Sequence, residues 1–80
     1  ACEWSEFGIR VNAVSPGYIA TRYDPGNFPE GWYDAWLARS PTKRLGTPTE
    51  VAGAVAYLAG DLAGFTTGAN LVVDGGYSCY

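Results

Sequence analysis

The chain has 80 residues, which is enough for one small domain at most. It is 48% hydrophobic but only 16% charged, well below the usual charged fraction of about one quarter, so its composition is typical of a protein interior. Five basic and eight acidic residues leave a net charge of −3, and without a concentrated positive surface the chain is not expected to bind nucleic acid.

The first half of the chain divides at glycines and prolines into three expected elements. Residues 1–8 look like the last turns of a helix that began upstream, and Gly8 is expected to end it because glycine accepts the left-handed conformation. "IRVNAV", residues 9–14, is a short run of β-branched and small residues that predicts a strand covered on both faces. Residues 22–31 hold two prolines and two glycines and should be irregular, whereas residues 32–40 predict a short helix.

The clearest predicted helix starts at Thr47. Thr47 can cap the helix, Pro48 suits the first turn, where no amide hydrogen is needed, and Glu50 can reach back to the amide of the capping residue. Gly64 is the expected stop, and "ANLVVDGG", residues 69–76, predicts a second strand that ends at paired glycines. The apolar residues between cap and stop repeat at helical spacing along one face and are Val51, Ala54, Val55, Leu58, Ala59 and Leu62.

The order of these elements predicts an α/β fold. A strand, a helix and a second strand, with both strands strongly apolar, are typical of the crossover unit of a parallel sheet. Two parallel strands alone would leave both sheet edges and much of both faces in water. More sheet is therefore expected next to residues 9–14, in a longer protein of which this chain is a part.

Metal, membrane and disulfide functions are not expected. The chain has no histidine, and its two cysteines, Cys2 and Cys79, lie near opposite ends, so no metal site is predicted. A bridge between the cysteines is possible, but two cysteines are no disulfide framework and reduced thiols are expected. The longest apolar run is too short to span a bilayer, and no secretory signal is recognisable, so we expect a soluble protein of a reducing compartment, the cytoplasm.

Polar-tipped residues follow the first predicted strand in "VNAVSPGYIATRY", residues 11–23. In an open parallel sheet, ligands bind beyond the carboxyl ends of the strands, and the loop from Pro16 to Tyr23 leaves such an end. Gly17 lets the chain pass close to a flat partner, and the Thr21 hydroxyl can donate or accept a hydrogen bond. The residues alone leave two interpretations open, a ligand-binding loop and an ordinary turn after a strand.

Three stretches, "GIRVNAVSPGYIATRY", "RLGTPTEVAGAVAYLAG" and "TTGANLVVDGGY", resemble the carboxyl-terminal third of the short-chain dehydrogenase/reductase family. The resemblance implies that residues 1–80 are the carboxyl-terminal portion of a single doubly wound, Rossmann-like domain. It also implies that the loop at Pro16 and Gly17 closes over the nicotinamide of NAD(H) or NADP(H). The backbone of Ile19 would pair with the nicotinamide carboxamide, and the hydroxyl of Thr21 would contact the carboxamide or the adjoining phosphates.

The same resemblance suggests which residues face the substrate. Tyr18 would flank the reacting carbon, and residues 22–40 match the substrate loop of the family. Trp32, Tyr33 and Trp36 would close over a substrate, or they would pack against the body of the protein. The packing alternative is favoured for Trp36, and both alternatives stay open for Trp32.

Charged residues outside these loops receive structural roles. Lys43 and Arg44 resemble the basic pair that precedes the helix start in the family, and we expect them to be solvated or to support the helix cap. Asp74, which precedes two glycines after the second strand, is expected to be structural rather than catalytic.

The family's proton-transfer machinery is not found in these residues. The catalytic tyrosine and lysine, spaced Y-x-x-x-K, and the glycine-rich phosphate turn are both expected upstream, so no catalytic residue is assigned here. The resemblance implies an oxidoreductase that uses NADP or NAD to interconvert a small-molecule carbonyl and a secondary alcohol. "PGYIAT" resembles the branch acting on sugars, polyols and related ketones, and the full-length protein is expected to be a homo-oligomer. The alternative is a non-catalytic fragment that acts only in subunit assembly or partner binding.

Overall fold

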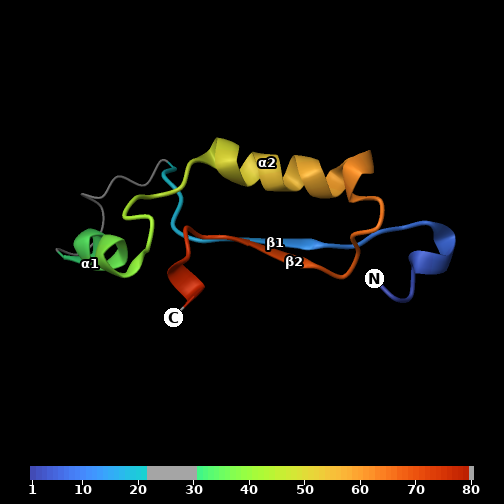
Figure 1. Ribbon diagram of the computed structural model, residues 1–80, viewed down its shortest axis with the longest axis horizontal. Coiled ribbons are helices and arrows are strands. Elements are labelled where there is room, and N and C mark those ends of the chain that lie inside the picture. Colours follow the sequence, from blue (N-terminus) through green and yellow to red (C-terminus); the bar gives the residue numbers. More distant parts are fainter. Residues whose placement is uncertain (22–30, 80) are drawn as a thin grey trace.

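The computed structural model describes residues 1–21 and 31–79. In chain order the described residues form β1 (Ala13–Pro16), α1 (Trp32–Arg39), α2 (Pro48–Ala59) and β2 (Asn70–Val73), as Figure 1 shows. α1 confirms the short helix predicted over residues 32–40. Short 3-10 turns are formed by Ser5–Phe7, Asp61–Ala63 and Tyr77–Cys79.

β1 and β2 pair in parallel, in a register that runs from Ala13 opposite Asn70 to Pro16 opposite Val73. α2 belongs to the connection between the strands and lies along one face of the pair (Figure 1). This arrangement of strand, helix and parallel strand confirms the predicted α/β fold class. The carboxyl ends of both strands point toward the end of the molecule that carries α1 (Figure 1).

The start of α2 is the predicted capping box. The Thr47 hydroxyl accepts a hydrogen bond from the Glu50 amide over 3.2 Å, and the Thr47 amide donates to the Glu50 carboxylate over 3.1 Å. Pro48 occupies the first helical position, where a missing amide hydrogen costs nothing. The signals that begin this helix are local, because all of them lie within four consecutive residues.

The end of α2 differs from the prediction. The helix stops at Ala59, and Gly60 rather than Gly64 follows it, with the Gly60 amide bonded to the Tyr57 carbonyl over 3.2 Å. The guanidinium of Arg10 explains the early stop, because it binds carbonyls at this helix end. Leu62, expected on the apolar helix face, instead lies in the following 3-10 turn and is 91% exposed.

The first strand lies further along the chain than predicted. β1 spans Ala13–Pro16 rather than residues 9–14. The side chain of Asn12 accounts for the late start: its amide donates to the Thr66 carbonyl over 2.9 Å, and its oxygen accepts from the Ala69 amide over 3.0 Å. At residue 12 the Asn12 side chain therefore makes the hydrogen bonds to the second chain segment, and backbone pairing of the two strands begins at Ala13.

Residues 1–8 form turns rather than the expected end of an α-helix. The 3-10 turn Ser5–Phe7 is closed by Gly8, whose φ of 75° is left-handed and whose amide donates to the Ser5 carbonyl over 3.0 Å. Gly8 thus ends the element as predicted.

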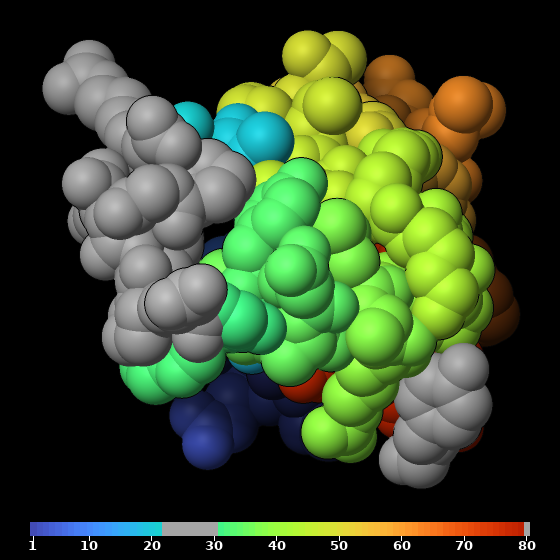
Figure 2. Space-filling model, turned by 90° about the vertical axis from the view of Figure 1, so that its left-hand side faces the viewer, coloured from blue at the N-terminus to red at the C-terminus, as the bar shows by residue number. Residues whose placement is uncertain are grey.

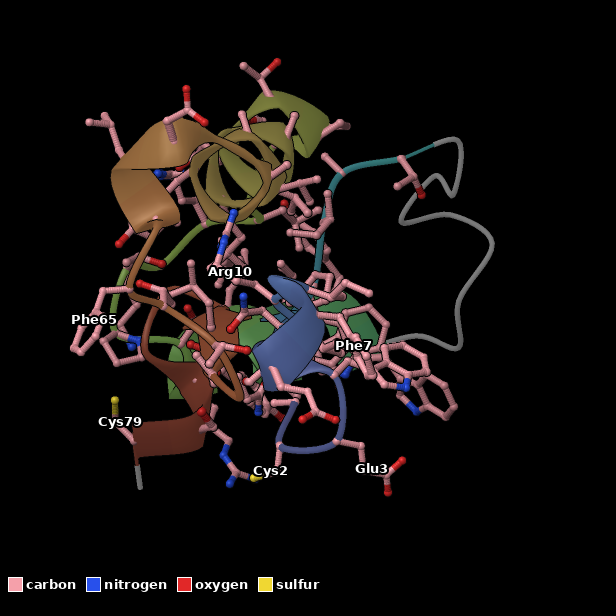
Figure 3. The ribbon with its side chains drawn as sticks, turned by 90° about the vertical axis from the view of Figure 1, so that its right-hand side faces the viewer. Cys2, Glu3, Phe7, Arg10, Phe65 and Cys79 are labelled. Atoms are coloured by element: carbon pink, nitrogen blue, oxygen red, sulfur yellow. The ribbon has the colours of Figure 1, made fainter. Side chains whose placement is uncertain are left out.

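Few side chains are buried in the described part of the chain. Leu58 and Ala63 are the buried hydrophobic residues there, whereas Phe65 is fully exposed and points away from the body of the molecule (Figure 3). Cys2 and Cys79 are both exposed and free. No described helix is long and apolar enough to cross a membrane, and residues 1–21 and 31–79 hold no cluster of side chains suited to a metal ion.

Candidate functional site

The carboxyl ends of β1 and β2 bring two loops into contact. Gly17 follows β1 and Asp74 follows β2, and the Gly17 amide donates a hydrogen bond to the Val73 carbonyl over 3.0 Å. A Cβ atom on residue 17 would lie 2.6 Å from the Cβ of Asp74, which is closer than real contacts allow. The crossing therefore requires glycine. The strand does not break at Pro16 and Gly17 as predicted, because Pro16 is the last residue of β1 and the Gly17 amide still bonds to Val73 of the neighbouring strand.

Gly46 holds the β1 loop, residues 17–21, in an extended conformation. The Gly46 amide donates to the Tyr18 carbonyl over 3.0 Å, the Ala20 amide donates to the Gly46 carbonyl over 2.8 Å, and Ile19 forms a parallel bridge between these bonds. Backbone groups alternate in direction along an extended chain, so the amide and carbonyl of Ile19 point away from Gly46. Among the described residues they have no hydrogen-bond partner. Ile19 therefore offers one donor and one acceptor side by side.

Thr21 lies at the far end of the same loop. Its side chain is exposed, and within the described ranges its hydroxyl is not hydrogen-bonded. Figure 2 shows the end of the β1 loop, in cyan, against the yellow start of α2, in agreement with the bridge between Ile19 and Gly46. The loop thus presents the predicted backbone pair and the predicted hydroxyl two residues apart.

An aromatic cluster (Tyr18, Trp36 and Tyr77) joins the β1 loop to α1. The ring of Tyr18 stacks on Trp36 with a centroid separation of 4.2 Å and an angle of 11° between the planes. Tyr77 meets the same ring edge-on at 5.2 Å, and the Arg39 guanidinium lies 4.7 Å from the centre of the Tyr77 ring. Trp36 is accordingly half-buried, as the packing alternative predicted, while Trp32 remains 51% exposed.

The aromatic cluster also affects the ionisation of Tyr18. Desolvation, followed by hydrogen bonding with Tyr77, raises the pKa of the Tyr18 hydroxyl above its ordinary value of 10.0. The shift favours the neutral phenol of Tyr18, which can donate a hydrogen bond. Sequence reasoning did not find Tyr77 or Arg39, and no motif marks them, because their partners come from distant parts of the chain.

Arg44 supports the helix cap, as one of its two predicted roles required. Its guanidinium makes a two-pronged ion pair with Glu50, with both N–O distances at 2.8 Å. Hydrogen bonding from Arg44, and then from Thr47, lowers the pKa of the Glu50 carboxyl to about 2. The pair fixes the start of α2 next to Gly46, and Gly46 in turn holds the β1 loop.

Asp74 has the structural role that was predicted for it. Its carboxylate accepts hydrogen bonds from the amides of Gly76 over 2.9 Å and Ser78 over 3.0 Å, and bonding from Ser78 lowers the pKa of Asp74. An open groove of about 430 Å³ runs along this edge, and Gly17, Tyr18 and Asp74 are among the residues that line it. That volume is in the range of small-molecule sites, about 300–1,000 Å³.

Comparison with known proteins agrees with this geometry. A family model described as enoyl-(acyl carrier protein) reductase matches residues 1–78. The crystal structure of a short-chain type dehydrogenase/reductase from Mycobacterium marinum is 39% identical and superposes on 100% of this chain with a TM-score of 0.87, covering 31% of its own length. The chain belongs to the short-chain dehydrogenase/reductase family.

Two further members of the short-chain dehydrogenase/reductase family are similar to the whole chain. A ribulose-forming D-arabinitol 2-dehydrogenase of Scheffersomyces stipitis is 48% identical over 84 aligned residues, which span 100% of this chain and 30% of that protein. The structure of 4-hydroxyisoleucine dehydrogenase complexed with NADH is 32% identical with a TM-score of 0.90, over 100% of this chain and 33% of that one. The chain thus spans about a third of the length of these relatives, and the predicted Rossmann-like fold class is confirmed.

Proposed function

We propose that this chain is the carboxyl-terminal portion of an NAD(P)(H)-dependent oxidoreductase that interconverts a carbonyl and a secondary alcohol. The observation that supports this most directly concerns the amide and carbonyl of Ile19 on the β1 loop, which have no hydrogen-bond partner among residues 1–21 and 31–79. A nicotinamide carboxamide has one amino donor and one carbonyl acceptor, and Ile19 presents the complementary pair. A bound carboxamide would satisfy both groups in place of solvent.

The other predicted cofactor contacts fit the same ligand. Pro16 and Gly17 line the groove, and the Thr21 hydroxyl, which has no partner among the described residues, lies two residues beyond Ile19. The nicotinamide would supply or accept the hydride when bound. The residues of this chain would orient it and exclude water, while an upstream tyrosine, helped by a lysine, moves the proton. The cofactor is NADP or NAD.

The proposed substrate is a sugar, a polyol or a related ketone. The support is the 48% identity to a D-arabinitol 2-dehydrogenase, together with exposed aromatic rings on the β1 loop, which lines the groove, and on α1. Tyr18 is 40% exposed and Trp32 is 51% exposed, so both retain ring surface that can pack on a sugar. The proposal includes a cytoplasmic, homo-oligomeric full-length protein with no membrane or nucleic-acid partner.

The alternative is a non-catalytic fragment that acts only in assembly or partner binding, a role that would use exposed apolar side chains. Phe65 is fully exposed, Leu62 is 91% exposed and Val72 is 46% exposed, so the described surface carries several large apolar side chains that are not packed. Such surface is expected where a further chain or further sheet packs.

Intact mass and cofactor titration distinguish the two functions. A purified protein about three times the mass of these 80 residues, as 30% coverage of a relative implies, is expected under the enzyme proposal. It should enhance NADH or NADPH fluorescence and oxidise polyols such as D-arabinitol. A protein of only 80 residues that binds no cofactor would refute the enzyme proposal and support the fragment.

A further inference from the structure

α1 is attached to the β1 loop by its aromatic side chains. No residue of α1 is fully buried, so the helix does not sit in a core of its own. The stack of Trp36 on Tyr18, at 4.2 Å, connects it directly to the loop that carries Ile19. A second contact comes one turn later, where the Arg39 guanidinium lies 4.7 Å from the ring of Tyr77.

Tyr18 is fixed in place from several sides. Its carbonyl accepts from the Gly46 amide, and the preceding amide, that of Gly17, is bonded to Val73 at the end of β2. Its ring stacks on the Trp36 ring, almost parallel at 11°, and meets the Tyr77 ring, almost perpendicular at 81°. A shift of α1 therefore moves the Tyr18 ring. Because Tyr18 directly precedes Ile19, this movement also displaces the Ile19 amide.

We propose that Trp36, through Tyr18, is a positioning residue that couples alcohol binding at α1 to cofactor binding at Ile19. The inference rests on the proposed function and adds a coupling between its two sites. Arg39 strengthens the coupling by contacting Tyr77, which in turn meets the Tyr18 ring edge-on. By thermodynamic linkage, if an alcohol bound at α1 increases the affinity for the cofactor, the cofactor increases the affinity for the alcohol by the same factor.

The test uses a ternary complex that cannot react. A reduced cofactor and an alcohol are both already reduced, so their joint binding is measured at equilibrium in the full-length protein. The coupling factor is the dissociation constant for the reduced cofactor alone divided by that with a saturating alcohol, the one that the parent oxidises fastest. Nicotinamide fluorescence gives both constants, with whichever of NADH or NADPH the parent binds more tightly.

Trp36→Ala is expected to lower the coupling factor by about 2- to 12-fold, the range of one aromatic pair, and Trp36→Phe should restore most of it. Arg39→Gln, at an exposed position, should lower it by about 2- to 5-fold. Trp4→Ala is the matched control, because residues 1–8 lie at the opposite end of the molecule from α1 (Figure 1). A purely structural role would lower the melting temperature and leave the coupling factor unchanged.

The possible outcomes separate the inference from the function on which it rests. An unchanged coupling factor in Trp36→Ala overturns the inference, and if that variant does not fold, an unchanged factor in Arg39→Gln does so. A parent that binds cofactor and oxidises an alcohol, but has a coupling factor of one, also overturns it. A parent that binds neither NADH nor NADPH refutes the proposed function itself.

Discussion

Gly17 and Asp74 cross with no space for a side chain between them, since a Cβ on residue 17 would lie 2.6 Å from the Cβ and 2.9 Å from the Cα of Asp74. Gly17→Ala must therefore push the ends of β1 and β2 apart. We expect a loss of about 1–3 kcal/mol in the free energy of unfolding of the full-length protein, as for other overpacked sites. Cofactor affinity should fall as well, because the Ile19 backbone moves with residue 17. Urea unfolding and NADH titration measure the two effects.

Gly53 provides the matched control for that substitution. It lies within α2, and no heavy atom outside the local helix would come within 4 Å of an added Cβ. Gly53→Ala should raise the free energy of unfolding by about 0.5–1 kcal/mol, because alanine is the better helix former. If Gly17→Ala were as stable as Gly53→Ala, the close crossing at Asp74 would be wrong.

Thr21→Val tests the predicted hydroxyl contact to the cofactor. Valine keeps the branched shape and removes one hydrogen bond, which leaves a polar partner on the cofactor unsatisfied. The expected loss of about 1–3 kcal/mol corresponds to cofactor binding that is roughly 5- to 150-fold weaker, with little change in stability. Nicotinamide fluorescence gives the dissociation constant.

Thr49→Val is the control for Thr21, because Thr49 is exposed and makes no hydrogen bond through its hydroxyl in the described structure. Thr66 lies in a loop, as Thr21 does, but it is unsuitable as a control because its hydroxyl is hydrogen-bonded to that of Tyr57 over 3.2 Å. Equal dissociation constants for Thr21→Val, Thr49→Val and the parent would show that the Thr21 hydroxyl does not touch the cofactor.

The stability given by Glu50 should depend on pH in the acid range. Its pKa falls from an ordinary 4.5 to about 2 in the folded chain, so the folded state favours the ionised form. The contribution is therefore complete above about pH 4.5 and is lost as the pH falls toward 2. The melting temperature of Glu50→Gln should lie below that of the parent at pH 6, and the two should converge near pH 2. A gap that stays constant between these pH values would contradict the assignment.

Arg10 should make a large contribution to the free energy of unfolding, although it lies in an irregular segment before β1. Its guanidinium points toward the end of α2 (Figure 3) and donates to the carbonyls of Leu58 over 2.9 Å, Thr66 over 3.2 Å and Gly60 over 3.3 Å. Arg10→Met leaves these acceptors without their donor, at an expected cost of about 1–3 kcal/mol in the free energy of unfolding. Arg10→Lys should recover only part of this, because an ammonium lacks the planar fork. Urea titration of the three proteins gives the order.

The elements that the sequence predicted correctly are those with local signals. Thr47, Pro48 and Glu50 determine the start of α2 within four residues, and the pattern of residues 32–40 is enough for α1. The loop after β1 was also located, because proline fixes φ and lacks an amide donor, whereas glycine permits a close approach of the backbone. None of these predictions required knowledge of a distant partner.

The errors fall where a side chain acts over a long distance along the chain. β1 starts late because Asn12 binds Thr66 and Ala69, and α2 stops early because Arg10 binds the carbonyls of Leu58, within the helix, and of Gly60, just after it. Neither bond can be anticipated from residues nearby in sequence. Tyr77 joined the candidate site in the same way, through the ring of Tyr18. The spacing of apolar residues predicts which face of a helix is apolar, but it does not predict where a distant side chain ends the helix.

The register of the sheet has a consequence for the order in which this region folds. Every pair of the ladder, from Ala13 with Asn70 to Pro16 with Val73, joins residues 57 positions apart. Closing so long a loop costs entropy before any contact forms, so the pairing is a late event. The Gly17 amide, whose acceptor is Val73, should then exchange with deuterium only when this pairing opens. On the ribosome, the β1 loop would stay unstructured until Val73 has emerged, and the cofactor site would be among the last parts of the protein to form.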